Sequence, residues 1–186
     1  MTRILLLSMI VIMAASRVEA IGGYLGVYSD QAGMQCDIYD TGPGMFSVYV
    51  VHSLSHGVSG ISFTAAIPEC ATGVSWDSDE SMFGIAIGDS QTGVTVLYGS
   101  GCVYSESITV MKINLIGSGM TPDCCLFPVE PFPGSVDIEA MDCDQHFLEV
   151  HPRDAIINQD YFICDCYQWI PVYSRSWGAI KALYQQ

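Results

Sequence analysis

Eight cysteines in a chain of 186 residues constrain this protein more than any other feature of its sequence. Disulfides at that density form and persist in oxidising compartments, whereas a reducing cytosol keeps thiols free. The sequence holds no C-x-x-C pair, so neither a thioredoxin-type redox site nor paired zinc knuckles are indicated. We expect structural disulfides from Cys36, Cys70, Cys102, Cys124, Cys125, Cys143, Cys164 and Cys166.

The pairing stays open at this level, because eight cysteines allow 105 connectivities. Positions 124 and 125 are adjacent, and positions 164 and 166 are one residue apart. A bridge inside either pair would be strained, so each of these cysteines is expected to reach outward. The predicted pairing is Cys36–Cys70, with Cys102 joined to Cys124 or Cys125 and Cys143 nearby.

Residues 1–20 have the pattern of a secretory signal peptide. Arg3 supplies the positive charge, and the apolar run that follows is about 12 residues long, shorter than the roughly 20 residues that span a bilayer. Val18 and Ala20 match the small residues of a signal-peptidase site, so cleavage is predicted after Ala20. The alternative is an N-terminal membrane anchor. We expect a secreted protein, extracellular or on the cell surface, with no transmembrane segment in the mature chain 21–186.

The charge balance argues against one large class of function. The chain has 20 acidic and 6 basic residues and a formal charge of −14, whereas nucleic-acid binding needs a basic face. Removing residues 1–20 leaves 19 acidic and 4 basic residues, so the mature charge is −15. That excess keeps a rather apolar domain soluble, and it also attracts divalent cations.

Short β-branched and apolar runs, separated by Gly, Ser, Asp and Pro, predict an all-β fold. Residues 46–54 alternate most clearly, and because neither face is strongly polar this strand is expected in the centre of a two-layer stack. We predict an antiparallel two-sheet sandwich stapled by disulfides over residues 21–160. The expected strands are 24–28, 35–39, 45–54, 60–67, 83–87, 93–98, 107–116, 126–129, 136–141, 147–150 and 155–157.

Residues 161–186 differ from the rest and are predicted to form a cysteine-bearing aromatic tail. Ser176 can cap a short helix over residues 177–184, and an isolated helix of that length is not stable in water. Its apolar face must therefore dock, either on this domain or on a partner. The residues of this candidate partner-binding face are Trp177, Ile180, Leu183 and Tyr184.

Two groups of acids are candidate calcium ligands, because Ca²⁺ prefers several oxygen ligands and acidic turns can supply them. The alternative interpretation is a solvated acidic surface. The predicted ligands are Asp77, Asp79 and Glu80 in the first group and Asp142 and Asp144 in the second. No other cofactor is expected.

Signals for catalysis are weak. His52 and His56 are four residues apart, but the strand and turn assigned there give this spacing no metal-binding meaning, and no zincin motif is present. No G-x-S-x-G elbow occurs, and no glycine-rich phosphate loop. A pair of carboxylates could hydrolyse glycosides, but no cleft is marked. We predict that the protein is not an enzyme.

Residues 45–158 resemble cohesin-like and related immunoglobulin-type sandwich modules of secreted bacterial proteins. The similar segments are VSGISFTAAIP at 58–68, SQTGVTVLY at 90–98, the strand at 107–116 and the acidic turn at 142–145. The eight cysteines depart from cohesins, so no binding residue is carried over. The mature chain is also similar to small secreted proteins of environmental bacteria, in GYLGVY at 23–28, CDIYD at 36–40 and WGAIKALY at 177–184. That resemblance implies fold and location but no activity.

Together these features predict a secreted, non-catalytic β-sandwich that acts as an extracellular or cell-surface interaction or structural module, with a protein or cell-surface partner. The alternative is a secreted protein that binds calcium or carbohydrate, through the acids or through Trp76. A hydrolase is the third interpretation.

Overall fold

The computed structural model describes residues 22–99 and 101–166, and their regular elements are all strands. The all-β prediction is confirmed. The strands are β1 (Tyr24–Tyr28), β2 (Asp37–Ile38), β3 (Pro43–Phe63), β4 (Val74–Ser81), β5 (Ile85–Asp89), β6 (Gly93–Leu97), β7 (Val103–Ser118), β8 (Cys125–Phe127), β9 (Ile138–Asp142), β10 (Phe147–Arg153) and β11 (Ala155–Ile157). The helix expected at 177–184 lies outside the described residues. Within the described part, no helix has the length and hydrophobicity of a membrane span.

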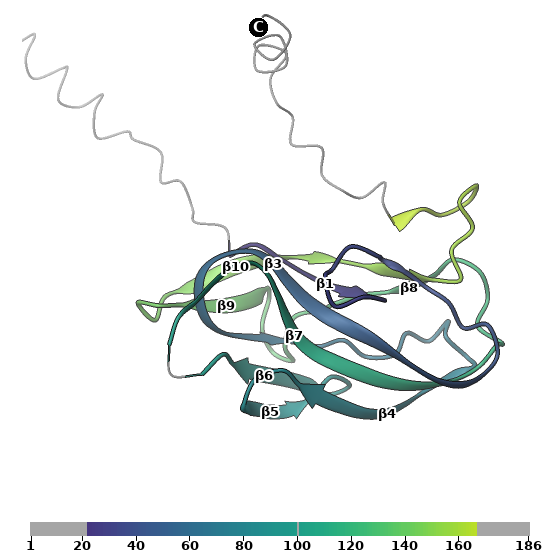
Figure 1. The fold of residues 1–186 in the computed structure, drawn as a ribbon, viewed down its shortest axis with the longest axis horizontal. Coiled ribbons are helices and arrows are strands. Elements are labelled where there is room, and N and C mark those ends of the chain that lie inside the picture. Colours follow the sequence, from purple (N-terminus) through teal and green to yellow (C-terminus); the bar gives the residue numbers. More distant parts are fainter. Residues whose placement is uncertain (1–21, 100, 167–186) are drawn as a thin grey trace, which may run out of the picture.

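Strand β3 organises the larger of two sheets, which has eight strands. Its first half pairs with β1 and β7, and its second half pairs with β6 and β9. Figure 1 shows β3 and β7 side by side through the middle of the body. Because β1 also pairs with β10, and β10 with β9, the sheet closes on itself. The second sheet is small, with the order β2-β11-β8.

This closure corrects the prediction of two separate antiparallel sheets. Sequence patterning treated residues 45–54 and 60–67 as two strands, but residues 45–54 and 60–63 belong to one strand of 21 residues, and residues 64–67 lie beyond its end. The strand turns from one layer to the other where its pairing with β7 shifts register, and Leu54 and Gly57 have positive φ angles of 58° and 77° there. Two pairings, β1 with β10 and β11 with β2, are parallel.

The core is built from residues of both sheets and is mostly aliphatic. Phe63 and Phe127 are its largest side chains with no exposed surface, and Leu25, Val50 and Ile113 pack in the same cluster. A second, smaller cluster on the other side of β1 contains Tyr28, Val51 and Ile156 with the Cys36–Cys166 bridge. The alternating residues of β3 thus serve two cores, which is why neither of its faces is strongly polar.

All eight cysteines are in disulfides, as expected, but the predicted pairing is wrong. The pairs are Cys36–Cys166, Cys70–Cys125, Cys102–Cys143 and Cys124–Cys164, with Cα–Cα distances of 5.5–6.0 Å. The partners are 40–130 residues apart, because strand order rather than chain order brings them together. Neither close pair bridges internally, in line with the geometric argument. Two of the bridges also hold residues 161–166 to the body.

One buried carboxylate holds the end of the small sheet against the end of β7. Asp40 is 4% exposed and accepts hydrogen bonds from the Gly119 N–H at 2.8 Å, the Thr121 N–H at 3.2 Å and the Thr121 hydroxyl at 2.8 Å. Burial alone would raise the pKa of Asp40, but these donors favour the ionised form and leave the pKa below its usual value. The carboxylate is therefore structural.

Candidate interaction surface

A solvent-facing surface crosses strands β5, β6, β3, β9 and β10, and we call it the open face. Strand register defines its first row: Ile85 lies opposite Leu97, Leu97 opposite Gly60, Gly60 opposite Met141, and Met141 opposite Phe147. Directly opposed side chains point to the same side of a sheet, so these five positions form one line of about 19 Å at the usual strand spacing.

The first row is apolar from end to end. Phe147 is 70% exposed and Ile85 is 49% exposed, while Leu97 and Met141 are half-buried. At Gly60, where no side chain projects, the row stays continuous because Leu97 leans over the glycine: a Cβ built there would lie 3.0 Å from Leu97 Cδ2. Contiguous exposed apolar area of this kind marks binding sites on soluble proteins.

A second row runs parallel to the first and changes from apolar to acidic along its length. It consists, in the same strand order, of Ile87, Thr95, Ser62, Glu139 and Glu149. The hydroxyls of Ser62 and Thr95 are hydrogen-bonded at 2.8 Å. Glu139 and Glu149 lie directly opposite each other, and like charges in this position destabilise a strand pair. His151 Nδ1 lies 3.9 Å from Glu149 Oε1.

The β5 end of the open face is an unprotected sheet edge. Within the described part of the chain, strand β5 pairs with β6 alone and ends the path of the sheet. Its first four residues are exposed, and they carry no charge. Natural edge strands are usually shielded by charge, proline or a bulge, so an apolar edge of this kind suits contact with another chain.

The second predicted calcium group lies at the other end of this face, in the turn between β9 and β10. Asp142 Oδ1 accepts the N–H groups of Asp144 and His146, each at 2.8 Å. The hydrogen bond from the His146 N–H is the main reason that the pKa of Asp142 is lowered. The His146 ring lies 3.4 Å from Asp142 Oδ2. One potential ligand atom from each of these three residues lies within 4.8 Å of the others, and His146 was not among the predicted ligands.

The first predicted calcium group is arranged differently, since protein donors already occupy its central carboxylate. Asp79 accepts the Trp76 indole N–H at 3.0 Å, the Ser90 hydroxyl at 2.9 Å and the Ser90 N–H at 2.6 Å. Glu80 faces Lys112 at 3.3 Å, and Asp77 accepts a bond from its neighbour Ser78. These contacts tie β4 to β7 and to the turn before β6. Among the described residues, one group of possible metal ligands lies close together, at 142–146, and Asp77, Asp79 and Glu80 do not belong to it.

His52 is buried in the body and contacts the first described residue, Gly22. Its Nε2 lies 2.6 Å from the Gly22 carbonyl, so Nε2 carries the proton, and its Nδ1 accepts the Tyr98 hydroxyl at 3.2 Å. The side chain has no exposed surface, and burial lowers its pKa. A neutral imidazole enclosed in this way has no access to a substrate. The candidate partner-binding residues Trp177, Ile180, Leu183 and Tyr184 lie outside the described residues.

Comparisons with known proteins define the class of fold. No protein-family model and no curated protein matches the chain. Among solved structures, a cohesin module of a family 33 glycoside hydrolase from Clostridium perfringens has a TM-score of 0.50 and 8% identity, and the match covers 76% of this chain and 100% of that one. A non-cellulosomal cohesin from the archaeon Archaeoglobus fulgidus has a TM-score of 0.50 and 10% identity, over 75% of this chain and 92% of that one.

A third similar structure is the third ScaB cohesin of R. flavefaciens, solved in complex with a group 1 dockerin. It has a TM-score of 0.51 and 12% identity, over 76% of this chain and 98% of that one. At such identities the likeness concerns the fold, and function has to be argued from the surface. The body of this chain therefore has a cohesin-like fold, which confirms the predicted resemblance.

Proposed function

We propose that this chain is a secreted, non-catalytic module that binds a protein partner through its open face. The observation that carries the proposal is the unbroken apolar row from Ile85 to Phe147 on a solvent-facing sheet. A flat sheet face with apolar side chains in line suits a protein surface better than a small molecule, because small ligands are usually enclosed in concave sites.

The charges on the open face point to the chemistry of the partner. The Glu139–Glu149 pair lies beside the apolar row, and the mature chain carries a formal charge of −15. A partner with an apolar strip flanked by Lys or Arg would relieve the repulsion of these glutamates and be steered by the overall field. The fold supports this proposal, since the cohesin of R. flavefaciens with a similar fold was solved bound to a protein, a dockerin.

Secretion is part of the same proposal. Residues 1–20 have the signal-peptide pattern, and four disulfides hold the described body. Cleavage after Ala20 would leave one residue before Gly22, whose N–H already donates to the Glu149 carbonyl at 2.8 Å. The proposed mature chain thus begins one residue before the described residues, and we propose for it a body over 21–160 and a tail over 161–186.

Differential capture tests the proposal. The mature protein is immobilised beside an Ile87→Glu/Phe147→Glu variant of the open face and a Val136→Glu control, since all three positions are at least 66% exposed. We expect one extracellular protein to be retained by the wild type and the control and lost by the face variant. That protein, once purified, should bind the wild type in a calorimetric titration. Equal retention by all three proteins would contradict the proposed face.

Calcium binding is a second candidate function, supported by the cluster of Asp142, Asp144 and His146. A ligand that binds only the folded state raises stability by RT ln(1 + [L]/Kd), about 2.7 kcal/mol at a hundredfold excess over Kd. We expect millimolar calcium to raise the thermal midpoint relative to excess EDTA, and Asp144→Asn to abolish the rise. If calcium leaves the thermal midpoint unchanged, these acids form a solvated acidic surface and not a calcium site.

A further inference from the structure

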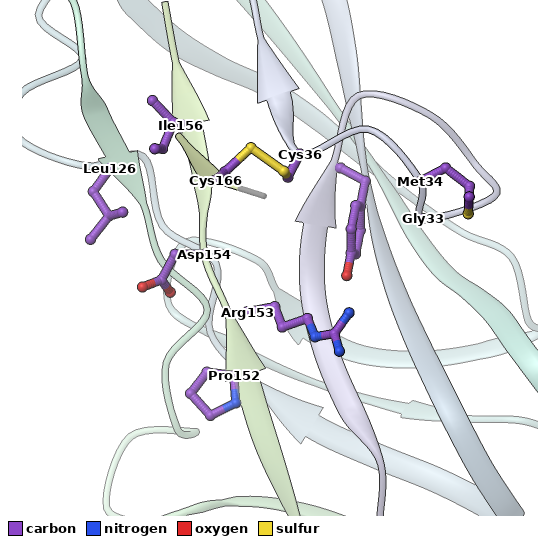
Figure 2. A pocket seen from close by; sticks show the side chains of 10 residues that line it. Gly33, Met34, Cys36, Leu126, Pro152, Arg153, Asp154, Ile156 and Cys166 are labelled. Carbon is purple, nitrogen blue, oxygen red and sulfur yellow. A yellow bond between two sulfur atoms is a disulfide. The ribbon is translucent and has the colours of Figure 1, made fainter. Parts of the chain in front are cut away.

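A cavity of about 450 Å³ opens beside the Cys36–Cys166 disulfide. Figure 2 shows the disulfide at its centre, with Met34 on one side and Leu126, Ile156 and Asp154 on the other. The floor is the second hydrophobic cluster, which includes Tyr28. This volume lies within the range of about 300–1,000 Å³ that is typical of pockets for organic ligands and side chains.

Among the described residues, two buried polar atoms of side chains that line this cavity have no hydrogen-bond partner. They are the Tyr28 hydroxyl and Arg153 Nε, and Tyr28 is only 5% exposed. The Arg153 guanidinium is already held over the Tyr24 ring, 4.2 Å from its centroid, so it cannot simply swing into water. Buried donors without acceptors are costly, and folded proteins rarely leave them unpaired. Because neither atom is exposed in the cavity as it stands, the apolar wall defines the occupant, which has to supply apolar groups.

The chain provides such an occupant at the rim of the cavity. Cys166 lines the cavity and is the last described residue, and the sequence continues as YQWIPVY over 167–173. Trp169 follows Cys166 by three residues, so the two Cα atoms are at most about 11 Å apart. At the effective concentration of a short linker, on the order of 1 mM, even a weak contact would be largely formed.

Charge favours the same occupant. Residues 22–166 hold all 19 acidic residues of the mature chain but only two bases, Lys112 and Arg153. Residues 167–186 hold no acid and the two remaining bases, Arg175 and Lys181. These two positive charges, just beyond residues 167–173, are attracted to a body of net charge −17 and hold the segment near it. A free acidic or neutral peptide would lack this attraction.

We propose that residues 167–173 dock in the cavity of their own chain, with the Trp169 side chain against Leu126, Met34 and the Cys36–Cys166 bridge. The proposal goes beyond the open face, and either could fail without the other. It would leave the apolar face predicted at 177–184 available to a partner.

Fluorescence of a single tryptophan tests the docking in the full mature, oxidised protein. Trp76→Phe and Trp177→Phe leave Trp169 as the only tryptophan. We expect its emission to be blue-shifted, and its acrylamide quenching constant to be lower by about threefold or more, relative to a synthetic peptide of residues 167–186 that carries the same Trp177→Phe change. Leu126→Glu and Met34→Glu should each restore the peptide's values, and Val136→Glu should not.

The variants are chosen so that unfolding does not mimic the result. Leu126 is 46% exposed and Met34 is 72% exposed, so a glutamate at either position leaves the core intact, and near-ultraviolet dichroism verifies this. Quenching at the rate of the free peptide, or protection that survives both glutamate variants, would overturn the proposal. Protection that disappears on dilution, together with a dimer in sedimentation, would also overturn it and assign the cavity to a second copy.

Discussion

Three of the four disulfides belong to one closed circuit, and this predicts that they contribute equally to stability. Along the circuit the chain runs from Cys36 to Cys70, crosses to Cys125, steps to Cys124, crosses to Cys164 and returns to Cys166. The chain segments 36–70, 124–125 and 164–166 add up to about 37 residues. Each of the three bridges closes this same loop when the other two are intact. Sequence separation alone would rank the same bridges very differently, at 130, 55 and 40 residues.

The chain-entropy relation converts these lengths into free energies of unfolding. A loop of 130 residues corresponds to about 5 kcal/mol at 25 °C, and one of 40 residues to about 4 kcal/mol. With the other bridges intact, however, removing any one of the three opens a loop of only about 37 residues. The free energy of unfolding should then fall by about 4 kcal/mol. For a body of this size that corresponds to a fall in Tm of about 8–16 °C.

Equilibrium urea unfolding of two double variants tests this. Cys36→Ala/Cys166→Ala and Cys124→Ala/Cys164→Ala should each lose about 4 kcal/mol and agree within about 0.5 kcal/mol, with larger m-values because the unfolded chains are less compact. Cys102→Ala/Cys143→Ala, outside the circuit but 41 residues apart, serves as a control with a similar expected loss. A loss for the first variant at least 1 kcal/mol greater than for the second would refute the circuit and restore sequence separation as the governing length.

Further predictions concern buried groups. Asp40→Asn should lower the unfolding free energy by about 3 kcal/mol, since one end of the amide must face donors of Gly119 or Thr121; an unchanged urea midpoint would contradict this. Because the pKa of His52 is lowered in the fold, the unfolded chain takes up the proton first, and stability should be lost as pH falls below about 6.5, by at most about 1.4 kcal/mol per pH unit. His52→Gln should remove this part of the slope between about pH 6.5 and 5, and equal slopes in both proteins would argue against it. Phe63→Ala should cost about 3–5 kcal/mol in the same urea assay, because Phe63 has no exposed surface; a loss below about 1 kcal/mol would place it outside the core.

Strands with a clear apolar pattern were predictable. Residues 24–28 and 155–157 are strands β1 and β11 with the expected bounds, and β6 differs from its expected range by one residue. Strand β4 was not predicted, because VSWDSDES has no apolar face: it pairs with β7 and is largely solvated. Its acids were interpreted as calcium ligands, whereas Asp79 holds β4 in place through Trp76 and Ser90.

The open face could not be predicted in the same way. Ile85, Leu97, Met141 and Phe147 are spread over about 60 residues, and each is unremarkable in its own segment. They form a row only because the registers of four strand pairs align them, and a shift of one residue in any pair would turn those side chains to the other side.

The sequence by itself determined the all-β class, the oxidised state of the cysteines and the strong negative charge, because period-2 patterning, cysteine density and net charge are properties of local segments or of the composition. Tertiary structure alone decided the closure through β3, the disulfide partners, the rows of the open face and the cavity beside Cys166. The physical reason is that each of these depends on strand order and register, which are selected by burying one shared core around residues such as Phe63.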